Sequence, residues 1–539
     1  MAKAKWSKLF KLTNKHKKPI SPKTKDTSGE ANNIPKKYLD KQLGINIQTL
    51  QQTTGNSDDI VIRKIELGIN PSIKAAVIVT DGLVDDQLVS EFIITTLLEE
   101  TKNKEIIPVE SLFDRIEKKF LTIANVSSIY AWDELFPSLL AGEAIILIDG
   151  LAKALSTSTR GGEKRSITEP TTELSIRGPK DSFTESIRTN TSLIRRRINN
   201  PNLWLHSMKI GKVTQTDIAI MYINGIANDK IVEEVKRRLN SIEVDEILET
   251  GYIEQFIEDE TFTTFPTIYH TERPDVVASN LMEGKIAIVV DGTPFVLTVP
   301  ALFIEFFQVP DDYYSRFDIS IAIRFLRVLV FFISLIAPAT YIAVTTFHQE
   351  MVPTQLIIAI AAQREAVPFP AFVEAMLMEI TFEILREAGV RLPRSIGQAV
   401  SIVGALVIGQ AAVDAGIVSP AMVIVVSITA IASFATPSFA MAISVRIIRF
   451  SLMFLAAFMG FYGIIFGLMI MTLHLCSLRS FGIPYMAPFA PIMAKNLGDS
   501  LIRLPLWKLK TRPKLISQKN ITRTADNQKP TPPTEENNS

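Results

Sequence analysis

The sequence has very little cysteine, since Cys476 is the only one in 539 residues. An intramolecular disulfide is therefore excluded, as is a metal site built from several thiolates. The five histidines are scattered, and no spacing pairs a nucleophile with a base or gathers metal ligands. No glycine-rich phosphate-binding motif follows a predicted strand, so nucleotide binding has no support. We expect no enzyme activity, no metal and no cofactor.

The chain also lacks a net charge of either sign. Its 57 Lys and Arg stand against 56 Asp and Glu, a net charge of +1, which gives no reason to expect nucleic acid binding. The N-terminus lacks the apolar core of a signal peptide, so the domain that follows should stay in the cytoplasm. Residues 1–56 are rich in Lys, Ser, Thr and Asn. We expect a disordered basic tail, either solvated or attracted to anionic lipid.

What the first half does contain is a repeat. Four short apolar, β-branched runs each end in Asp-Gly or Asn-Gly, which is typical of a strand followed by a turn. They are Ala75–Gly82, Ala144–Gly150, Asp217–Gly225 and Lys285–Gly292. The first and third turns, like the second and fourth, lie about 143 residues apart, and each half carries a helical stretch (Asp86–Glu100, Asp229–Ile247). We predict a soluble α/β N-terminal domain of two duplicated subdomains, 57–155 and 211–318, each with a partly parallel sheet.

The aspartates that end three of these runs have two interpretations. Asp81, Asp149 and Asp291 could be catalytic or metal-binding carboxylates, but Asp before Gly commonly serves turn geometry. The repetition favours the turn.

A polar stretch, 156–210, is predicted to link the two subdomains. It contains RSITEP (Arg165–Pro170) and RGPKDSFTESIRTNTSLIRRRI (Arg177–Ile198). Arg195, Arg196 and Arg197 could form an anion-binding patch, although a salt-bridged face beside Asp181 and Glu185 is the commoner outcome. At the end of the second subdomain we expect an aromatic-rich helix at about Ala301–Phe317.

The second half has what the first lacks, long uncharged runs. About 20 apolar residues are needed to cross a membrane as a helix. Four runs approach this length: Val328–Phe347, Ser395–Val413, Ala415–Val445 and Phe450–Leu478. We therefore predict an all-α polytopic membrane domain at 319–495 and a basic polar tail at 496–539. Four spans would leave Arg446 and Arg449 outside, so a further crossing or re-entrant segment is expected, within Pro353–Glu387 or around Phe481–Lys495.

Acidic residues stand out in this membrane half. Glu379, Glu383 and Glu387 recur every four residues and share one face of a predicted helix. Such a stripe could form stacked acidic rings around a cation path, or it could be paired within the helix as Glu383–Arg386 and Glu387–Arg391. Asp414 lies between two runs and Pro437 interrupts one. Gly463 and Gly467, with Gly460 one turn earlier, have the spacing of close helix packing.

Three segments of this half resemble the A subunit of the GerA-type spore germinant receptors. They are Pro368–Pro393, Ile396–Val413 and Ser433–Phe450, and the linker sequences around Arg177-Gly178-Pro179 and Arg195-Arg196-Arg197 are similar to the same family's signature. The resemblance covers about residues 60–495. Gln363–Ala366 and Asp414 depart from the usual pattern.

The resemblance implies a role that the residues alone do not give. It implies a multi-pass protein of the spore inner membrane that works with a transporter-like B subunit and a lipoprotein C subunit. A homo-oligomer, a pentamer, would form a germinant-gated cation channel, with Glu374, Glu379 and Glu383 near the path. The alternatives are a sporulation-stage paralogue acting as an accessory ion channel and a solute transporter subunit, although no inverted repeat is visible in the membrane half.

Overall fold

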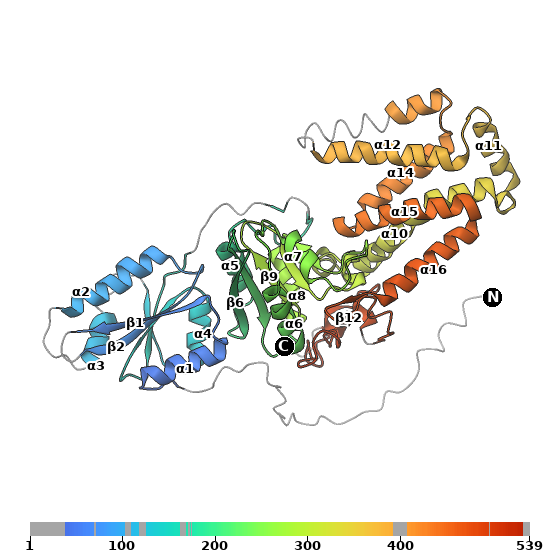
Figure 1. Cartoon of the computed structure of the whole chain (residues 1–539). Coiled ribbons are helices and arrows are strands. Elements are labelled where there is room, and N and C mark those ends of the chain that lie inside the picture. The colour runs from blue at the N-terminus through green and yellow to red at the C-terminus, as the bar shows by residue number, and fades with distance from the viewer. Residues whose placement is uncertain are drawn as a thin grey trace, which may run out of the picture.

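The structure is a computed structural model with two α/β subdomains at one end and a group of long helices at the other (Figure 1). It describes residues 38–68, 72–102, 109–117, 125–161, 169–170, 173, 175–391, 407–494 and 496–531. Residues 1–37, which hold most of the expected basic tail, lie outside the described residues.

The first subdomain is a five-stranded sheet covered on both faces. Its strand order is β1 (Ile60–Leu67), β2 (Ile73–Thr80), β4 (Ala144–Ile148), β5 (Ala154–Thr157), β3 (Val126–Ile129). Helices α1 (Leu43–Thr54) and α4 (Trp132–Leu140) pack on one face. The π-helix η1 (Leu88–Thr95), α2 (Thr96–Lys102) and α3 (Val109–Arg115) follow on the other side of the fold.

The second subdomain has the same strand order, position by position. Its sheet runs β6 (Leu203–Ile210), β7 (Thr216–Ile223), β9 (Ile286–Val290), β10 (Val296–Val299), β8 (Tyr269–Thr271). Its helices are α5 (Ile187–Arg197), α6 (Asp229–Asn240), α7 (Thr250–Ile257) and α8 (Pro274–Met282). The four apolar runs of the sequence are β2, β4, β7 and β9.

The prediction of partly parallel sheets is wrong, because every strand pairing in the two sheets is antiparallel. Continuous apolar strands suggested parallel pairing, since parallel sheets are buried on both faces. Here antiparallel sheets are buried on both faces as well. In β4, Ile145 and Leu147 face one core cluster while Ile146 and Ile148 face another.

Equivalent turns in the two subdomains make equivalent hydrogen bonds. Asp149 Oδ1 accepts the N–H of Leu43 (2.8 Å), the first residue of α1, and Asp291 Oδ1 accepts that of Ile187 (2.9 Å), the first residue of α5. The glycines that follow, Gly150 and Gly292, have φ of 91° and 87°, a region that glycine adopts without strain. These aspartates therefore start helices and shape turns, as the turn interpretation predicts.

Two boundaries of the expected domains differ from the structure. Helix α1 lies inside the expected tail 1–56, because Leu43, Ile47 and Leu50 share one buried face although the surrounding composition is polar. The expected linker 156–210 contains α5 and β6, and β6 pairs with β7 along its whole length. Low hydrophobicity hid these elements because α1 and β6 bury one face, and because several of the residues that α5 buries are polar, such as Asn190, Thr191 and Ser192.

The expected helix at Ala301–Phe317 is instead two short pieces, since Pro310 separates a 3₁₀ turn, η3 (Phe303–Phe307), from α9 (Asp311–Tyr314). Phe306 and Phe307 join the core of the helical half. The helices of this half are α10 (Phe317–Thr346), α11 (Thr354–Arg364), α12 (Ala371–Arg391), α14 (Pro420–Phe434), α15 (Phe439–Met459) and α16 (Phe461–Ser477), with a 3₁₀ turn, η4, at Gln349–Met351. Residues 407–414 are also helical.

Among the described residues, α10 and α15 are long and apolar enough to cross a membrane, and α14 and α16 are shorter apolar helices. The expected run Ala415–Val445 is two helices, because residues 435–438 break it and Ser438 caps α15. The expected run Phe450–Leu478 is broken at Gly460, whose φ is 59°. Most of the expected run Ser395–Val413 lies outside the described residues.

The C-terminal segment does not behave as a free tail. After a small hairpin, β11 (Arg479–Ser480) and β12 (Ile483–Pro484), come the 3₁₀ turns η5 (Leu497–Asp499) and η6 (Leu506–Lys508). Arg512 Nε donates to the carbonyl of Met282 (2.8 Å), and Ser517 Oγ to that of Ile226 (2.9 Å). The segment therefore returns to pack on the second subdomain.

Candidate functional site

Two ion pairs join α12 to α15 inside the helical half. Glu379 Oε2 lies 2.5 Å from Arg449 Nη1, and Glu383 Oε2 lies 2.7 Å from Arg446 Nη1. The side chains of Glu379 and Arg449 are 0% and 1% exposed. Such a pair is costly to desolvate, and losing one partner leaves the other as an uncompensated buried charge.

Each of these pairs leaves hydrogen-bonding capacity unused. Within the described residues, Glu379 Oε1, Glu383 Oε1 and Arg449 Nη2 are buried and have no hydrogen-bond partner. Buried polar atoms are normally satisfied, so exceptions call for an explanation such as stored strain or a function in another state.

Glu374, five residues before Glu379 on α12, belongs to a second buried cluster. It accepts hydrogen bonds from the N–H (2.6 Å) and the hydroxyl of Ser419, the N-cap of α14. Arg364 Nε lies 3.5 Å from its other oxygen, and Tyr341 Oη lies 3.1 Å from Ser419 Oγ. The carboxylate thus ties the end of α11 to the start of α14, and Ser419 extends the cluster to Tyr341 near the end of α10.

The acidic face of α12 is turned into the bundle, and its opposite face is apolar. Val373, Leu377, Ile380 and Ile384 are exposed, whereas Glu374 and Glu379 are fully buried. Of the two intrahelical pairs weighed from the sequence, Glu387–Arg391 is present at 2.6 Å. Glu383 pairs with Arg446 of α15.

The other candidates lie apart from this cluster. Asp414 is exposed, and its Oδ1 accepts from Gln410 Nε2 (3.0 Å). Pro437 is in the break between α14 and α15.

The three glycines mark close contacts between helices. A Cβ on Gly463 would lie 2.2 Å from the carbonyl oxygen of Leu455, and one on Gly467 would lie 2.4 Å from Cδ2 of Leu452. Both clashes are with α15. A Cβ on Gly460 would lie 2.6 Å from Cε1 of His348 at the end of α10.

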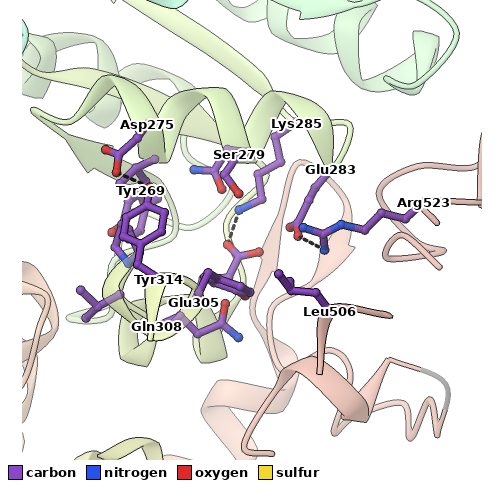
Figure 2. Close-up of a pocket in the computed structure, with 15 residues that line it drawn as sticks. Tyr269, Asp275, Ser279, Glu283, Lys285, Glu305, Gln308, Tyr314, Leu506 and Arg523 are labelled. Carbon is purple, nitrogen blue, oxygen red and sulfur yellow. Dashed lines mark hydrogen bonds and ion pairs between the residues drawn. The ribbon is translucent and has the colours of Figure 1, made fainter. Parts of the chain in front are cut away.

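A cavity of about 280 Å³ lies where the second subdomain, α9 and the C-terminal segment meet (Figure 2). Lys285 crosses it to Glu305 (2.6 Å), and Glu283 pairs with Arg523 of the C-terminal segment (3.4 Å). Burial raises the pKa of Glu283 to about 6, against the opposing effect of Arg523 and Lys285. Figure 2 shows Asp275 and Tyr314 on the opposite side from Glu283 and Arg523.

Beside this cavity, one buried carboxylate holds the start of α10. Asp312 Oδ2 of α9 lies 2.9 Å from Arg324 Nε and 2.7 Å from Arg327 Nη1. Arg324 Nη1 also donates to the carbonyls of Asp499 and Ser500 (3.0 Å each). We name this region, from η3 through α9 to Asp499 and Arg523, the joint. It connects the second subdomain, the first long helix and the C-terminal segment.

The linker signature residues also make structural contacts. Buried Arg195 makes a bidentate pair with Asp59 (2.7 and 3.0 Å) across the two subdomains, and Arg197 pairs with Asp181 (2.5 Å). Arg196 donates to the carbonyl of Gly161 (3.1 Å).

The Arg177-Gly178-Pro179 segment reaches the joint. Gly178 has φ of 133°, and a Cβ there would lie 2.5 Å from the ring of Tyr314. Two residues earlier, Ile176 N–H donates to Asp311 Oδ2 (3.2 Å). Arg165–Thr168 of the RSITEP motif lie outside the described residues.

The sequence did not identify the partners of the acidic residues. Arg446 and Arg449 were interpreted as ends of spans, whereas they lie within α15 and neutralise α12. Arg446 and Arg449 are three residues apart and Glu379 and Glu383 are four apart, so each pair lies on one face of its helix. This spacing is the feature of the sequence that could have identified the partners. Asp312 is buried between two arginines, and no periodic pattern in the sequence marks it as part of a site.

Comparison with known proteins gives a consistent answer. Residues 48–515 match the family described as Bacillus/Clostridium GerA spore germination protein. Spore germination protein KA of Bacillus subtilis (strain 168) is 58% identical over 494 residues, covering 92% of this chain and 90% of the relative. The uncharacterized membrane protein YfkQ of the same strain is 42% identical and covers 98% of both chains.

Among solved structures, the N-terminal domain of the A subunit of the Bacillus megaterium spore germinant receptor GerK3 is 45% identical. The match covers 50% of this chain and 98% of that domain, with a TM-score of 0.39. The family match spans far more than half of the chain, and the resemblance found in the sequence is confirmed: the chain belongs to the GerA family of spore germination proteins.

Proposed function

We propose that this chain is the A subunit of a germinant receptor that forms, with B and C subunits, a germinant-gated cation channel in the spore inner membrane. Relatives named as spore germination proteins, over nine-tenths of the chain in the case of KA, support the receptor role. The subunit would act as a homo-oligomer, a pentamer, surrounded by membrane lipid.

The same proposal makes the chain a multi-pass protein whose α/β subdomains, products of one duplication, face the cytoplasm. The long apolar helices α10 and α15 and the shorter α14 and α16 support the membrane placement. Arg324 and Arg327 at the start of α10 support a cytoplasmic N-terminal half, because positive charges collect on that side.

The observation that carries the channel proposal is the pair of ion pairs between α12 and α15. Ionised groups inside a membrane are costly and tend to mark ion paths. In the arrangement described here, Glu379 and Glu383 are neutralised by Arg449 and Arg446. A shift of α12 away from α15 would free both carboxylates to attract cations. Glu374 lies earlier on the same helix, and Asp414 and Pro437 lie at the ends of neighbouring helices.

Gating then requires a link to the nutrient. The nutrient, bound at a partner subunit, opens the channel only if it binds the open assembly more tightly than the closed one. The joint is well placed to take part, because Asp312 holds the first long helix against the second subdomain.

The test is the double substitution Glu379→Gln with Glu383→Gln, made in the chromosome and assayed in spores given nutrient. We expect altered cation release, because two carboxylates are removed and two arginines lose their partners. Glu387→Gln is the matched control on the same helix, since its carboxylate is exposed and, among the described residues, pairs with Arg391. If release and ion selectivity match those of unmodified spores, the carboxylates are not part of the path. If deleting the whole chain leaves the nutrient response intact, the receptor role itself is refuted.

A further inference from the structure

A loop of the second subdomain is fastened to the end of the last apolar helix. Thr263 Oγ1 lies 2.9 Å from His474 Nε2, three residues before α16 ends at Ser477. The carbonyl of Thr264 accepts a hydrogen bond from Ser444 Oγ near the start of α15. Phe265 packs into the core of the helical half. The loop 258–265 therefore lies at the same level as the ends of α15 and α16.

Large apolar side chains project outward from this loop and from α7. Phe262 is 93% exposed, and Tyr252 and Phe256, one turn apart on α7, are 38% and 52% exposed. Burial of apolar side chains of this size is strongly favourable, so their exposure to water has a cost. Three of them together, next to the helix ends, form what we name the aromatic patch.

The groove beside the aromatic patch carries charges of both signs. It lies between α6, α7 and the end of α16, and three arginines and three acidic residues line it: Arg237, Arg238, Arg479, Glu258, Asp259 and Glu260. Arg238 and Asp259 already pair with each other at 2.5 Å. Arg479 is exposed, and its Nη1 makes a long hydrogen bond to the carbonyl of Gly482 (3.4 Å).

We propose that this surface rests on the membrane, with the aromatic patch inserted at the headgroup level and the groove holding a zwitterionic phospholipid headgroup. The phosphate would bind the guanidinium of Arg479, and the ammonium of a phosphatidylethanolamine would bind Glu258 and Glu260. Aromatic side chains favour this interfacial level. The inference rests on the proposed membrane placement of α16.

Two features favour lipid over a protein partner. The patch continues directly into the exposed apolar side of α16, where Met469, Ile470 and Leu473 are each about half exposed or more. Arg237 and Arg238 pair with Glu234 and Asp259, so Arg479 on one side and Glu258 and Glu260 on the other supply the opposite charges that a zwitterionic headgroup binds. A protein docking on the patch would also have to cover the end of a helix that lies in lipid.

Depth measurements with spin labels test the placement. In a Cys476→Ser background, single cysteines replace Phe262, Met469 on α16, and Tyr130, an exposed aromatic residue of the first subdomain. The unmodified chain, labelled at its native Cys476 two residues after His474, gives the reference for the end of α16. The full chain is reconstituted in bilayers of phosphatidylethanolamine and phosphatidylglycerol, and collisions with oxygen and with a water-soluble nickel chelate report depth.

We expect the labels at 262 and 476 at headgroup depth, the label at 469 in the acyl region and the label at 130 in water. If the label at 262 is as accessible to nickel as the label at 130 while the label at 469 is in lipid, the membrane contact of the aromatic patch is overturned and the membrane placement of α16 stands. A label at 469 in water overturns the membrane placement itself. The two failures are therefore distinguishable.

Lipid retention tests the headgroup. Native mass spectra of the detergent-extracted protein should show bound phosphatidylethanolamine that is reduced at least several-fold by Arg479→Gln and kept by Phe262→Trp. Equal retention in the wild type and in Arg479→Gln overturns the headgroup assignment. Capture of phosphatidylglycerol in its place does so as well.

Discussion

At the residue scale, the buried pair between Glu379 and Arg449 sets the cost of altering the membrane half. Glu379→Gln leaves the guanidinium of Arg449, 1% exposed, without its counter-charge. We expect a loss of about 3–5 kcal/mol. Thermal unfolding of the detergent-solubilised protein measures it. Glu387→Gln on the same helix should change the midpoint little, because that pair is exposed. Equal midpoints for the two variants would contradict the role given to the buried pair.

A second residue-scale prediction concerns pH and lies outside the membrane. Burial raises the pKa of Glu254 on α7 to about 7, and Glu258 and Glu249 add to the effect. A carboxyl whose pKa is raised in the folded state favours folding while it is protonated, so this contribution is lost as pH rises from about 4.5 to about 7. Glu254→Gln should therefore stabilise the second subdomain above pH 7, by about 1–3 kcal/mol, and change little near pH 4.5.

Fluorescence of Trp204 on β6 follows unfolding of that subdomain. Glu233→Gln on the exposed face of α6 is the control and should show the wild-type pH dependence. If Glu254→Gln and the wild type lose stability equally as pH rises, Glu254 is not the group that titrates.

The carboxylates of the candidate site could be found from the sequence, but their partners could not. Glu379 and Glu383 stand out because charge is rare in an apolar context. Arg446 and Arg449 lie 63 and 70 residues further along, and pairing over that separation depends on how α12 packs on α15. The matching spacing of the two arginines and the two glutamates is compatible with such a pairing, but it does not show which two helices pack together.

At the scale of elements, the contact between α15 and α16 depends on glycines, which have no side chain and so let the two helices approach closely. A Cβ on Gly463 would meet the backbone of Leu455 at 2.2 Å, and backbone cannot move aside as a flexible side chain can. Gly463→Ala should therefore push α16 away and lower the unfolding midpoint by several degrees. Gly409→Ala is the matched control, because its Cβ would make an ordinary contact of 3.6 Å with Val423 and gain about 1 kcal/mol of helix propensity. Equal unfolding midpoints for Gly463→Ala and Gly409→Ala would show that α15 and α16 can separate without a loss of stability.

Strands and turns were predictable at this scale, whereas helix boundaries were not. β2, β4, β7 and β9 each end in a turn that local chemistry dictates, with glycine at φ between 76° and 91°. The direction of strand pairing was missed because burial on both faces looks the same in parallel and antiparallel sheets. The continuation of α15 through Arg446 and Arg449 was missed because charge was taken to end a membrane helix, whereas these arginines are neutralised by another helix.

At the scale of the whole molecule, the C-terminal segment connects parts that are distant in sequence. Its Asp499 and Ser500 accept hydrogen bonds from Arg324 of α10, and its Arg523 pairs with Glu283 of the second subdomain. Lys519 adds an exposed pair with Asp229 (2.6 Å) at the start of α6. A change in the second subdomain can therefore reach the first long helix through this segment as well as through α9.

Removing the segment beyond residue 504 should distinguish the route through the C-terminal segment from the route through α9. The deletion of 505–539 keeps Asp499 on Arg324 but removes Arg512, Ser517, Lys519 and Arg523 from the second subdomain. We expect the protein still to reach the membrane, because α10 to α16 are intact, but the spores to respond to nutrient several-fold more slowly. Deleting only 532–539, which lie outside the described residues, is the control and should leave the response unchanged. Membrane content measured by immunoblot separates lost coupling from lost protein. A normal response from the longer deletion at a normal protein level would mean that α9 and Asp312 alone transmit the signal.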